Sequence, residues 1–158
     1  MAKKKNKNSD GLIAQNKKGY FDYFIEETIE TGIELKGTEV KSLRINGGSI
    51  KEAHADFKGE EIFLFNAHIP EYKQAGEHLQ HEPTRARKLL LHKREIKRLI
   101  GLKQQKGYTL IATRMYFNSR GLVKVALGIA KGKKQHDKRQ AIKDRDWNRR
   151  KAQVLKDY

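Results

Sequence analysis

Apolar and polar residues alternate along much of this chain with the two-residue period of β-strands. The clearest example runs from Leu122 to Ala130, where every second residue from Val123 to Ile129 is Val, Leu or Ile. Thr31-Gly32 interrupts the first such run, and we expect a bulge there. Similar runs predict six strands, at residues 20–35, 49–58, 61–69, 85–91, 108–118 and 122–130.

Two segments have a helical period instead. Residues 93–105 place Ile96, Leu99 and Ile100 on one face, and Gly107 follows as a terminating glycine. We expect a shorter helix at residues 39–44 and a loop at residues 70–84, which contain both prolines. Strands in largely hairpin order, with few helices, predict a mainly β fold built as a small closed antiparallel barrel.

The charge of the chain is large and unevenly distributed. Its 158 residues carry a net charge of +16, yet residues 19–82 carry −7, whereas residues 83–106 carry +8 and residues 131–158 carry +7. This pattern favours a polyanionic partner that contacts the second half of the fold and the C-terminal segment. No apolar run is long enough to cross a bilayer, and the N-terminus has no signal-peptide pattern, so we expect no membrane partner. The lack of cysteine predicts a cytoplasmic location.

Neither end of the chain has a pattern that could form a core. Residues 1–12 are rich in Lys and Asn and are expected to be a mobile basic tail. Residues 131–158 contain eleven Lys and Arg against four Asp, and the chain's single tryptophan, Trp147, lies there among charged residues. We expect this segment to be disordered when free and to fold on a polyanion, the alternative being a solvated tail that only aids solubility.

Residues that could catalyse a reaction or hold a metal form no recognisable site. His78 and His81 are close in sequence but lie in an acidic loop, and we interpret them as ordinary exposed histidines. Gly132-Lys133 matches part of a phosphate-binding loop, but Leu127 and Lys134 stand where that motif needs Gly and Ser or Thr. We therefore predict that the protein is not an enzyme and has no catalytic residue, cofactor or metal.

Binding residues are more prominent. Basic side chains concentrate on the predicted strand at 85–91 and the predicted helix at 93–105; they are Arg85, Arg87, Lys88, Lys93, Arg94, Lys97 and Arg98. Alone, such a face is most simply solvated. Together with the basic C-terminal segment it favours single-stranded or structured RNA. The alternatives are a ribosome-associated protein that holds ribosomal RNA and, as a third class, an RNA-modifying enzyme.

Four stretches of the sequence resemble one protein family. They are YFIEETIETGIELKGTEVKSLR at 23–44, PTRARKLLL at 83–91, LGIAKGKK at 127–134 and the overlapping run GKKQHDKRQAIKDRDWNRR. Together they resemble the SmpB family, small bacterial proteins that bind transfer-messenger RNA (tmRNA). The resemblance covers roughly residues 12–156, and within this span only residues 71–82 lack a match.

This resemblance implies a six-stranded, OB-like closed barrel over residues 13–130, with about three short helices and a disordered basic tail over residues 131–158. It implies that the barrel binds the tRNA-like domain of tmRNA and that the protein acts in trans-translation, which rescues ribosomes stalled on messages without a stop codon. The tail would fold on the ribosome and probe the decoding centre and the empty mRNA channel. The implied partners are tmRNA, the stalled 70S ribosome with its 16S rRNA and, through tmRNA, elongation factor Tu and alanyl-tRNA synthetase. We expect a monomer.

The site residues that the resemblance implies fall into two groups. The first would contact tmRNA: Asn16, Glu30, Leu90, Lys131, Lys133 and Lys134. The second would contact the decoding centre or the mRNA channel: His136, Asp137, Lys138, Arg139, Ile142, Lys143, Arg145 and Trp147. A carboxylate repels phosphate, so Glu30 would have to accept hydrogen bonds from RNA amines or hydroxyls. Residues 140–153 lack Gly and Pro, so the tail can become helical once its charge is neutralised.

Overall fold

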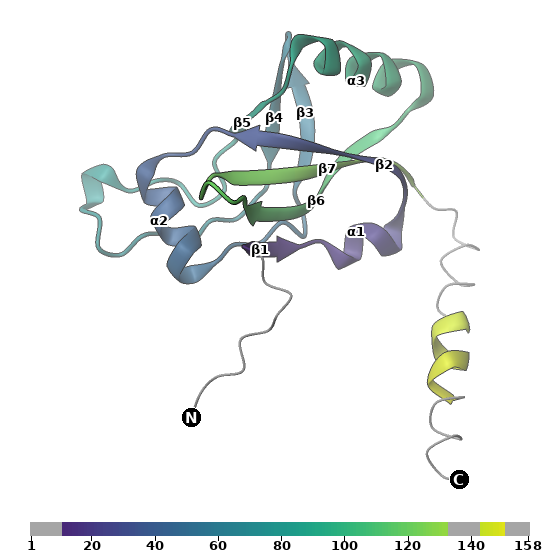
Figure 1. Cartoon of the computed structure of the whole chain (residues 1–158), viewed down its shortest axis with the longest axis horizontal. Helices are drawn as coiled ribbons and strands as arrows, with labels where there is room; N and C mark the ends of the chain where they lie inside the picture. Colours follow the sequence, from purple (N-terminus) through teal and green to yellow (C-terminus); the bar gives the residue numbers. More distant parts are fainter. Residues whose placement is uncertain (1–10, 133–142, 151–158) are drawn as a thin grey trace.

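The structure is a computed structural model that describes residues 11–132 and 143–150, and its dominant feature is one antiparallel sheet (Figure 1). The described residues form seven strands, β1 (Leu12–Gln15), β2 (Tyr23–Ile33), β3 (His54–Lys58), β4 (Glu61–Phe65), β5 (Arg87–Leu90), β6 (Thr109–Phe117) and β7 (Val123–Gly132). Their order is β1-β6-β3-β4-β5-β2-β7, and β7 also pairs with β6. The predicted mainly β, antiparallel fold is confirmed.

The sheet curves so that β7, the last strand in this order, also pairs with β6 near its beginning. The ladders around the resulting ring differ in length. The β2–β7 and β6–β7 ladders have nine and eight paired positions, whereas β2–β5 and β3–β6 have two each. The described strands number seven rather than the six predicted, because β1 adds to the edge of β6. The described chain is thus a strongly curved and unevenly paired antiparallel sheet.

Helices cover both ends of the sheet. The helical elements within residues 11–132 are α1 (Lys17–Asp22), α2 (Gly37–Asn46), the single turn η1 (Glu77–Leu79) and α3 (Lys93–Lys106). In Figure 1, α3 crosses one end of the sheet, and α1 lies at the other end beside β1. The helix predicted at 93–105 is confirmed, and Gly107 ends it in the left-handed conformation with φ 65°. The sequence pattern does not predict α1, because residues 20–22 fit a strand alternation equally well.

The core consists mainly of inward-facing strand residues, which Leu43 of α2, Leu99 of α3 and buried residues of the connecting segments, such as Ile50 and Ile69, complete. The four apolar residues that alternate from Val123 to Ile129 are all buried, as the pattern predicts. On β6 the expected alternation changes phase, because the β6–β7 register shifts between Ala112 and Arg114. Arg114 is therefore exposed and Met115 buried, although strict alternation from Ala112 would give the reverse.

Two further predictions about strands need correction. The bulge in β2 lies between Ile25 and Glu27 rather than at Thr31-Gly32. At Gly32 the strand instead gains a second neighbour, because Gly32 pairs with both Lys124 of β7 and Leu90 of β5. The last strand also continues to Gly132, two residues beyond the boundary predicted from the apolar alternation.

Part of the C-terminal segment is helical, whereas the sequence predicts disorder throughout 131–158. Residues 143–150 form a helix in which every residue is exposed, and Trp147 is 62% exposed. The absence of Gly and Pro around it explains why this stretch can be helical without a core. The predicted mobile tail at 1–12 falls mostly on residues 1–10, which lie outside the described residues, as do 133–142 and 151–158. In the described part of the chain, no helix is long and apolar enough to cross a membrane.

Candidate nucleic-acid interface

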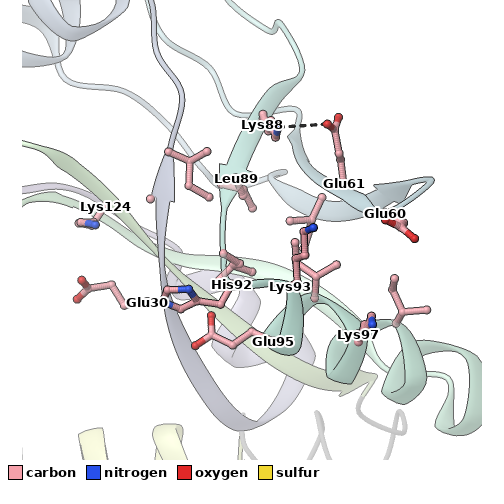
Figure 2. Close-up of a pocket in the computed structure, with 16 residues that line it drawn as sticks. Glu30, Glu60, Glu61, Lys88, Leu89, His92, Lys93, Glu95, Lys97 and Lys124 are labelled. Carbon is pink, nitrogen blue, oxygen red and sulfur yellow. Dashed lines mark hydrogen bonds and ion pairs between the residues drawn. The ribbon is translucent and has the colours of Figure 1, made fainter.

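A groove of about 760 Å³ lies between β2, β5 and the start of α3 (Figure 2). Its apolar lining comes from β4, β5 and α3 and consists of Ile62, Leu89, Leu90, Leu91, Ile96 and Ile100. Its charged lining consists of Glu30, Glu60, Glu61, Lys88, Lys93, Glu95, Lys97 and Lys124, with His92 beside them. An apolar floor with charged groups at its edge suits the flat face of a base and the phosphates next to it.

Glu30 and Leu90, both implied as tmRNA contacts by the family resemblance, meet at this groove. Leu90 pairs with Gly32 of β2, and Glu30 lies two residues before Gly32 on the same face of that strand. A Cβ atom on Gly32 would lie only 3.1 Å from the Cβ of Leu90. Glycine at this position therefore lets the half-exposed Leu90 lie directly against β2, next to Glu30.

The carboxylate of Glu30 is held by a neutral donor. The phenol of Tyr116 on β6 donates a hydrogen bond of 2.5 Å to Glu30 Oε2. Partial burial and this hydrogen bond raise the pKa of Tyr116 to about 12, so the phenol stays protonated and keeps donating. The guanidinium of Arg114 lies 5.5 Å from the centroid of the Tyr116 ring. Glu30 is thus fixed through Oε2, while Oε1 can accept a hydrogen bond from a ligand.

The cations of the groove differ in how they are paired. Lys88 donates to Glu61 over 3.1 Å, the contact drawn as a dashed line in Figure 2. Among residues 11–132 and 143–150, no ion pair involves Lys93, Lys97 or Lys124. Figure 2 shows Lys124 on β7 near Glu30, and Lys93 and Lys97 on α3. These three ammonium groups are therefore available to phosphate.

Part of the basic face predicted from the sequence is not a surface at all. Arg87 is fully buried, where it forms an ion pair with the equally buried Glu39 of α2 and donates to Ala67 O over 2.9 Å. Arg85 binds the same carboxylate over 2.6 Å, and Arg98 pairs with Glu27 over 2.5 Å. The prediction is wrong for Arg87 and Arg85, which hold the fold together instead.

Asn16, also implied as a tmRNA contact, is 2% exposed. Its Oδ1 accepts a hydrogen bond of 2.9 Å from Gly19 N, which caps the first turn of α1. Its Nδ2 donates to Ala112 O over 3.0 Å and so ties α1 to β6. In this structure the side chain positions α1, and its amide is directed to the protein.

Lys131 lies far from the groove. Its Nζ is 4.9 Å from the centroid of the Tyr108 ring, and Tyr108 donates to Glu26 over 2.6 Å. Lys131 lies seven positions after Lys124 on β7, which corresponds to roughly 23 Å along the strand. The structure therefore does not bring Lys131 together with Glu30 and Leu90.

The remaining predicted residues belong to the C-terminal segment. Lys143, Arg145 and Trp147 lie on the exposed helix 143–150, and the Arg145 guanidinium is 5.4 Å from the centroid of the Phe21 ring. The others lie outside the described residues: Lys133, Lys134, His136, Asp137, Lys138, Arg139 and Ile142.

The histidine interpretation is corrected in one respect. His81 is 2% exposed rather than an exposed loop residue, and its ring nitrogens lie 3.0 Å from Thr38 Oγ1 and 3.0 Å from Ile69 O. It therefore connects the loop before β5 to α2. Within the described ranges, no group of three or more His, Asp or Glu side chains could hold a metal ion.

Tyr116 and Lys124 are the groove-side residues that the sequence analysis missed. In the sheet they pair with each other, and Lys124 also pairs with Gly32. A signal was present in the alternation, since Lys124 is the polar member of the last run. It could not be linked to Glu30 without knowing that β7 lies between β2 and β6.

Comparison with known proteins gives a consistent set of relatives. The sequence profile of a family described as SmpB protein matches residues 13–157. An SsrA-binding protein from Rickettsia bellii (strain OSU 85-389) is 54% identical over 145 residues, covering 92% of this chain and 95% of the relative. One from Rickettsia felis (strain ATCC VR-1525 / URRWXCal2) is 56% identical, with the same coverage. A solved structure described as "tmRNA-SmpB: a journey to the center of the bacterial ribosome" matches with a TM-score of 0.64 and 45% identity, covering 81% of this chain and 92% of that chain.

Proposed function

The chain belongs to the SmpB protein family, and we propose that it binds tmRNA in trans-translation through the groove between β2, β5 and α3. Its curated relatives are named SsrA-binding proteins, and the structural match comes from a tmRNA-SmpB study of the ribosome. The extent of these matches supports the proposal, because each covers more than four-fifths of this chain.

The single observation that supports the groove as the binding surface is the position of Glu30. It lies beside the exposed Leu90, is held through one oxygen by Tyr116 and is flanked by Lys124. An unpaired base with an exocyclic amine can pack its face on Leu90 and donate to the free oxygen of Glu30. Lys93, Lys97 and Lys124 then lie where they can neutralise the phosphates around that base.

The basic C-terminal segment has a separate role in this proposal. The chain delivers tmRNA to ribosomes stalled on messages without a stop codon, and the tail enters the decoding centre and the empty mRNA channel. Lys131, near the end of β7, and the basic residues that follow it in the sequence supply further positive charge for RNA in this proposal. Elongation factor Tu and alanyl-tRNA synthetase are then indirect partners that act on tmRNA. An exposed helix with no core to join, as at 143–150, supports a segment that packs only on a partner.

The finer description of the fold is also part of the proposal. We infer that the curved sheet acts as an OB-like closed barrel, supported by the return of β7 to β6 in the strand order. The ring is weakest at the β2–β5 and β3–β6 ladders, which have two paired residue positions each, and we call these ladders its seams. The N–H of Glu34 donates to Lys88 O across the first seam, and the N–H of Ala112 donates to Ala53 O across the second. Slow amide exchange at Glu34 and Ala112 would support closure, and fast exchange at both would indicate an open sheet.

The experiment that tests the function is recovery of RNA with the tagged protein from bacterial cells, followed by sequencing. A discrete peak of tmRNA above its share of total RNA is expected. Recovery of bulk ribosomal RNA alone would contradict the proposal and favour a ribosome-associated protein that only holds ribosomal RNA. Glu71→Ala, an exposed substitution outside the groove, is the matched control for variants of Glu30.

A further inference from the structure

The bulge in β6 determines the direction in which Arg114 points. The β6–β7 register shifts between Ala112 and Arg114, and the extra residue, Thr113, is 1% exposed and donates a hydrogen bond of 2.9 Å to Ala126 O. Ala112 is buried in the core, so strict alternation would also direct Arg114 inward. The extra residue instead leaves Arg114 exposed, on the same face of β6 as Tyr116. Bulges often redirect a side chain at a binding site, and this one brings a cation to the outer surface of the sheet.

This outer surface connects β6 to the groove. Arg114 pairs with Ala126 of β7, and Ala126 pairs with Glu30 of β2, so the three residues form one row across the sheet. Figure 1 shows β7 between β2 and β6, in agreement with the strand order. Neighbouring strands lie about 4.8 Å apart, which places the backbones of Arg114 and Glu30 roughly 10 Å from each other.

The surface between Arg114 and Glu30 is open. Ala126, whose side chain is a single methyl group, is the residue between them in their row. Because no larger group lies there, the phenol of Tyr116 can reach over β7 to the carboxylate of Glu30. The same open surface lets an RNA strand that enters the groove at Leu90 continue over β7 towards β6.

The side chain of Arg114 is available to a ligand. It is exposed, and no ion pair involves it in the part of the chain that the structure describes. Its guanidinium lies 5.5 Å from the centroid of the Tyr116 ring. Contact with an aromatic ring restricts the position of a guanidinium, while its N–H groups can still donate to phosphate.

We propose that the RNA-binding surface continues from the groove across β7 to β6, where Arg114 binds a phosphate of the same RNA. The inference rests on the proposed function, because the groove supplies the base contact at Leu90 and Glu30. Lys124, which pairs with Tyr116, lies between Arg114 and the groove, so the two cations follow one path along the sheet. The base is then recognised at β2 and β5, whereas Arg114 fixes the position of the strand that carries it.

A purely supporting role for Arg114 would give a different result. If Arg114 only held the Tyr116 ring, its loss would weaken binding through Glu30 and leave the number of neutralised phosphates unchanged. A phosphate contact instead contributes about 0.7–0.9 to the slope of log affinity against log salt. The salt slope therefore separates the two roles, and Arg114→Lys, which keeps the charge, should keep the slope.

The test is titration of the tRNA-like domain of tmRNA with the full chain at several salt concentrations. Arg114→Gln should weaken binding about fivefold at low salt and reduce the slope by about 0.7–0.9. Lys73→Gln is the matched control, because it removes an equal charge from an exposed loop outside the groove, and it should match the wild type. Ala126→Leu should also weaken binding, whereas Ala126→Ser should not, because only leucine fills the open surface. Thermal melting checks the fold of each variant.

The possible outcomes separate the inference from the proposed function. Wild-type protein that does not bind this RNA would overturn both together. Wild-type binding that Glu30→Ala weakens, with affinity and salt slope unchanged by Arg114→Gln, would overturn the inference alone. An equal loss in Arg114→Gln and Lys73→Gln, or a loss of affinity in Arg114→Gln without a change in slope, would also overturn it. Arg114 is exposed, so its variants test the contact even if Ala126→Leu proves unstable.

Discussion

The phenol of Tyr116 donates a hydrogen bond of 2.5 Å to Oε2 of Glu30, although β7 lies between the strands that carry them. The contact runs across the outer surface of the sheet at the edge of the groove. It orients a carboxylate that would otherwise rotate freely, and it does so without a positive charge. The other oxygen, Oε1, is therefore left next to Leu90, which is the arrangement needed to accept a hydrogen bond from an amine of RNA.

Tyr116→Phe should weaken tmRNA binding while leaving the fold unchanged. The variant keeps the ring beneath Arg114 and removes only the hydroxyl. Losing the hydrogen bond that orients Glu30 should weaken the free energy of tmRNA binding by about 1 kcal/mol, or roughly fivefold in affinity. Titration of tmRNA measures this change, and thermal melting checks the fold. Tyr72→Phe, outside the groove, should match the wild type. Equal affinity of Tyr116→Phe and the wild type would show that the orientation of Glu30 is unimportant.

The salt dependence of tmRNA binding should show whether the lysines of the groove neutralise phosphates. Each phosphate neutralised by a lysine contributes about 0.7–0.9 to the slope of log affinity against log salt. Lys93→Gln with Lys97→Gln should therefore reduce the slope by about 1.4–1.8. Lys18→Gln, which removes a lysine already paired with Glu52 outside the groove, is the control and should leave the slope nearly unchanged. If the control and the double variant change the slope equally, phosphate is not bound at the groove.

The strands were predictable because alternation is a local property. Val123 to Ile129 and the helix carrying Leu99 each show their pattern within a few residues. The short β1 and α1 have no such pattern, because α1 is fixed by Asn16, whose Nδ2 bonds to Ala112 far along the chain. The phase change on β6 at Thr113 depends on its pairing with β7, which local sequence does not contain.

The site was less predictable than the fold, for a similar reason. Arg87 looks like a solvated basic residue because its partner, Glu39, lies 48 positions earlier. Glu30 and Leu90 were identified as site residues from the family resemblance alone. They lie close together because Leu90 pairs with Gly32, two residues after Glu30. No periodicity indicates that these residues share a groove. Net charge located the basic half of the chain but could not distinguish the buried Arg87 from the exposed Lys93.

Glu39→Gln should destabilise the protein strongly at neutral pH. Burial raises the pKa of Glu39, but hydrogen bonds from Arg85, from the Lys36 backbone and from Arg87 outweigh it, and the net pKa falls below its usual 4.5. Loss of this carboxylate leaves Arg87 buried without a counter-ion, at a cost of about 3–5 kcal/mol. Urea unfolding at neutral pH measures the difference, and Glu27→Gln, at the exposed pair with Arg98, should cost only about 0–1 kcal/mol.

The same pair has a defined acid dependence. A depressed carboxyl pKa contributes stability that is present above the unfolded value of 4.5 and is lost as pH falls through the lower folded value. The difference in unfolding free energy between the wild type and Glu39→Gln should therefore shrink as the pH falls from 4.5 through the lower folded pKa of Glu39. A difference that stays constant on acidification would mean that the charge of Glu39 is not what stabilises the fold.

Trp147→Ala should leave both stability and tmRNA affinity unchanged and should abolish tagging on stalled ribosomes. Trp147 is 62% exposed on a helix with no core, so its removal should not change the free energy of unfolding of the sheet. Its bulk matters only if the tail packs inside the ribosome. Melting, tmRNA titration and peptide tagging in a reconstituted translation system separate these effects. Normal tagging by Trp147→Ala would argue against a tail that probes the mRNA channel.

The most direct test of tmRNA binding at the groove is titration of the tRNA-like domain of tmRNA with the wild type, Glu30→Ala and Glu71→Ala. Both variants remove one exposed carboxylate, so a purely electrostatic surface would bind RNA equally well or more tightly in each case. The groove account predicts that Glu30→Ala binds about tenfold more weakly, because a hydrogen bond to a charged acceptor is lost, while Glu71→Ala does not. Equal or tighter binding by Glu30→Ala would contradict the account.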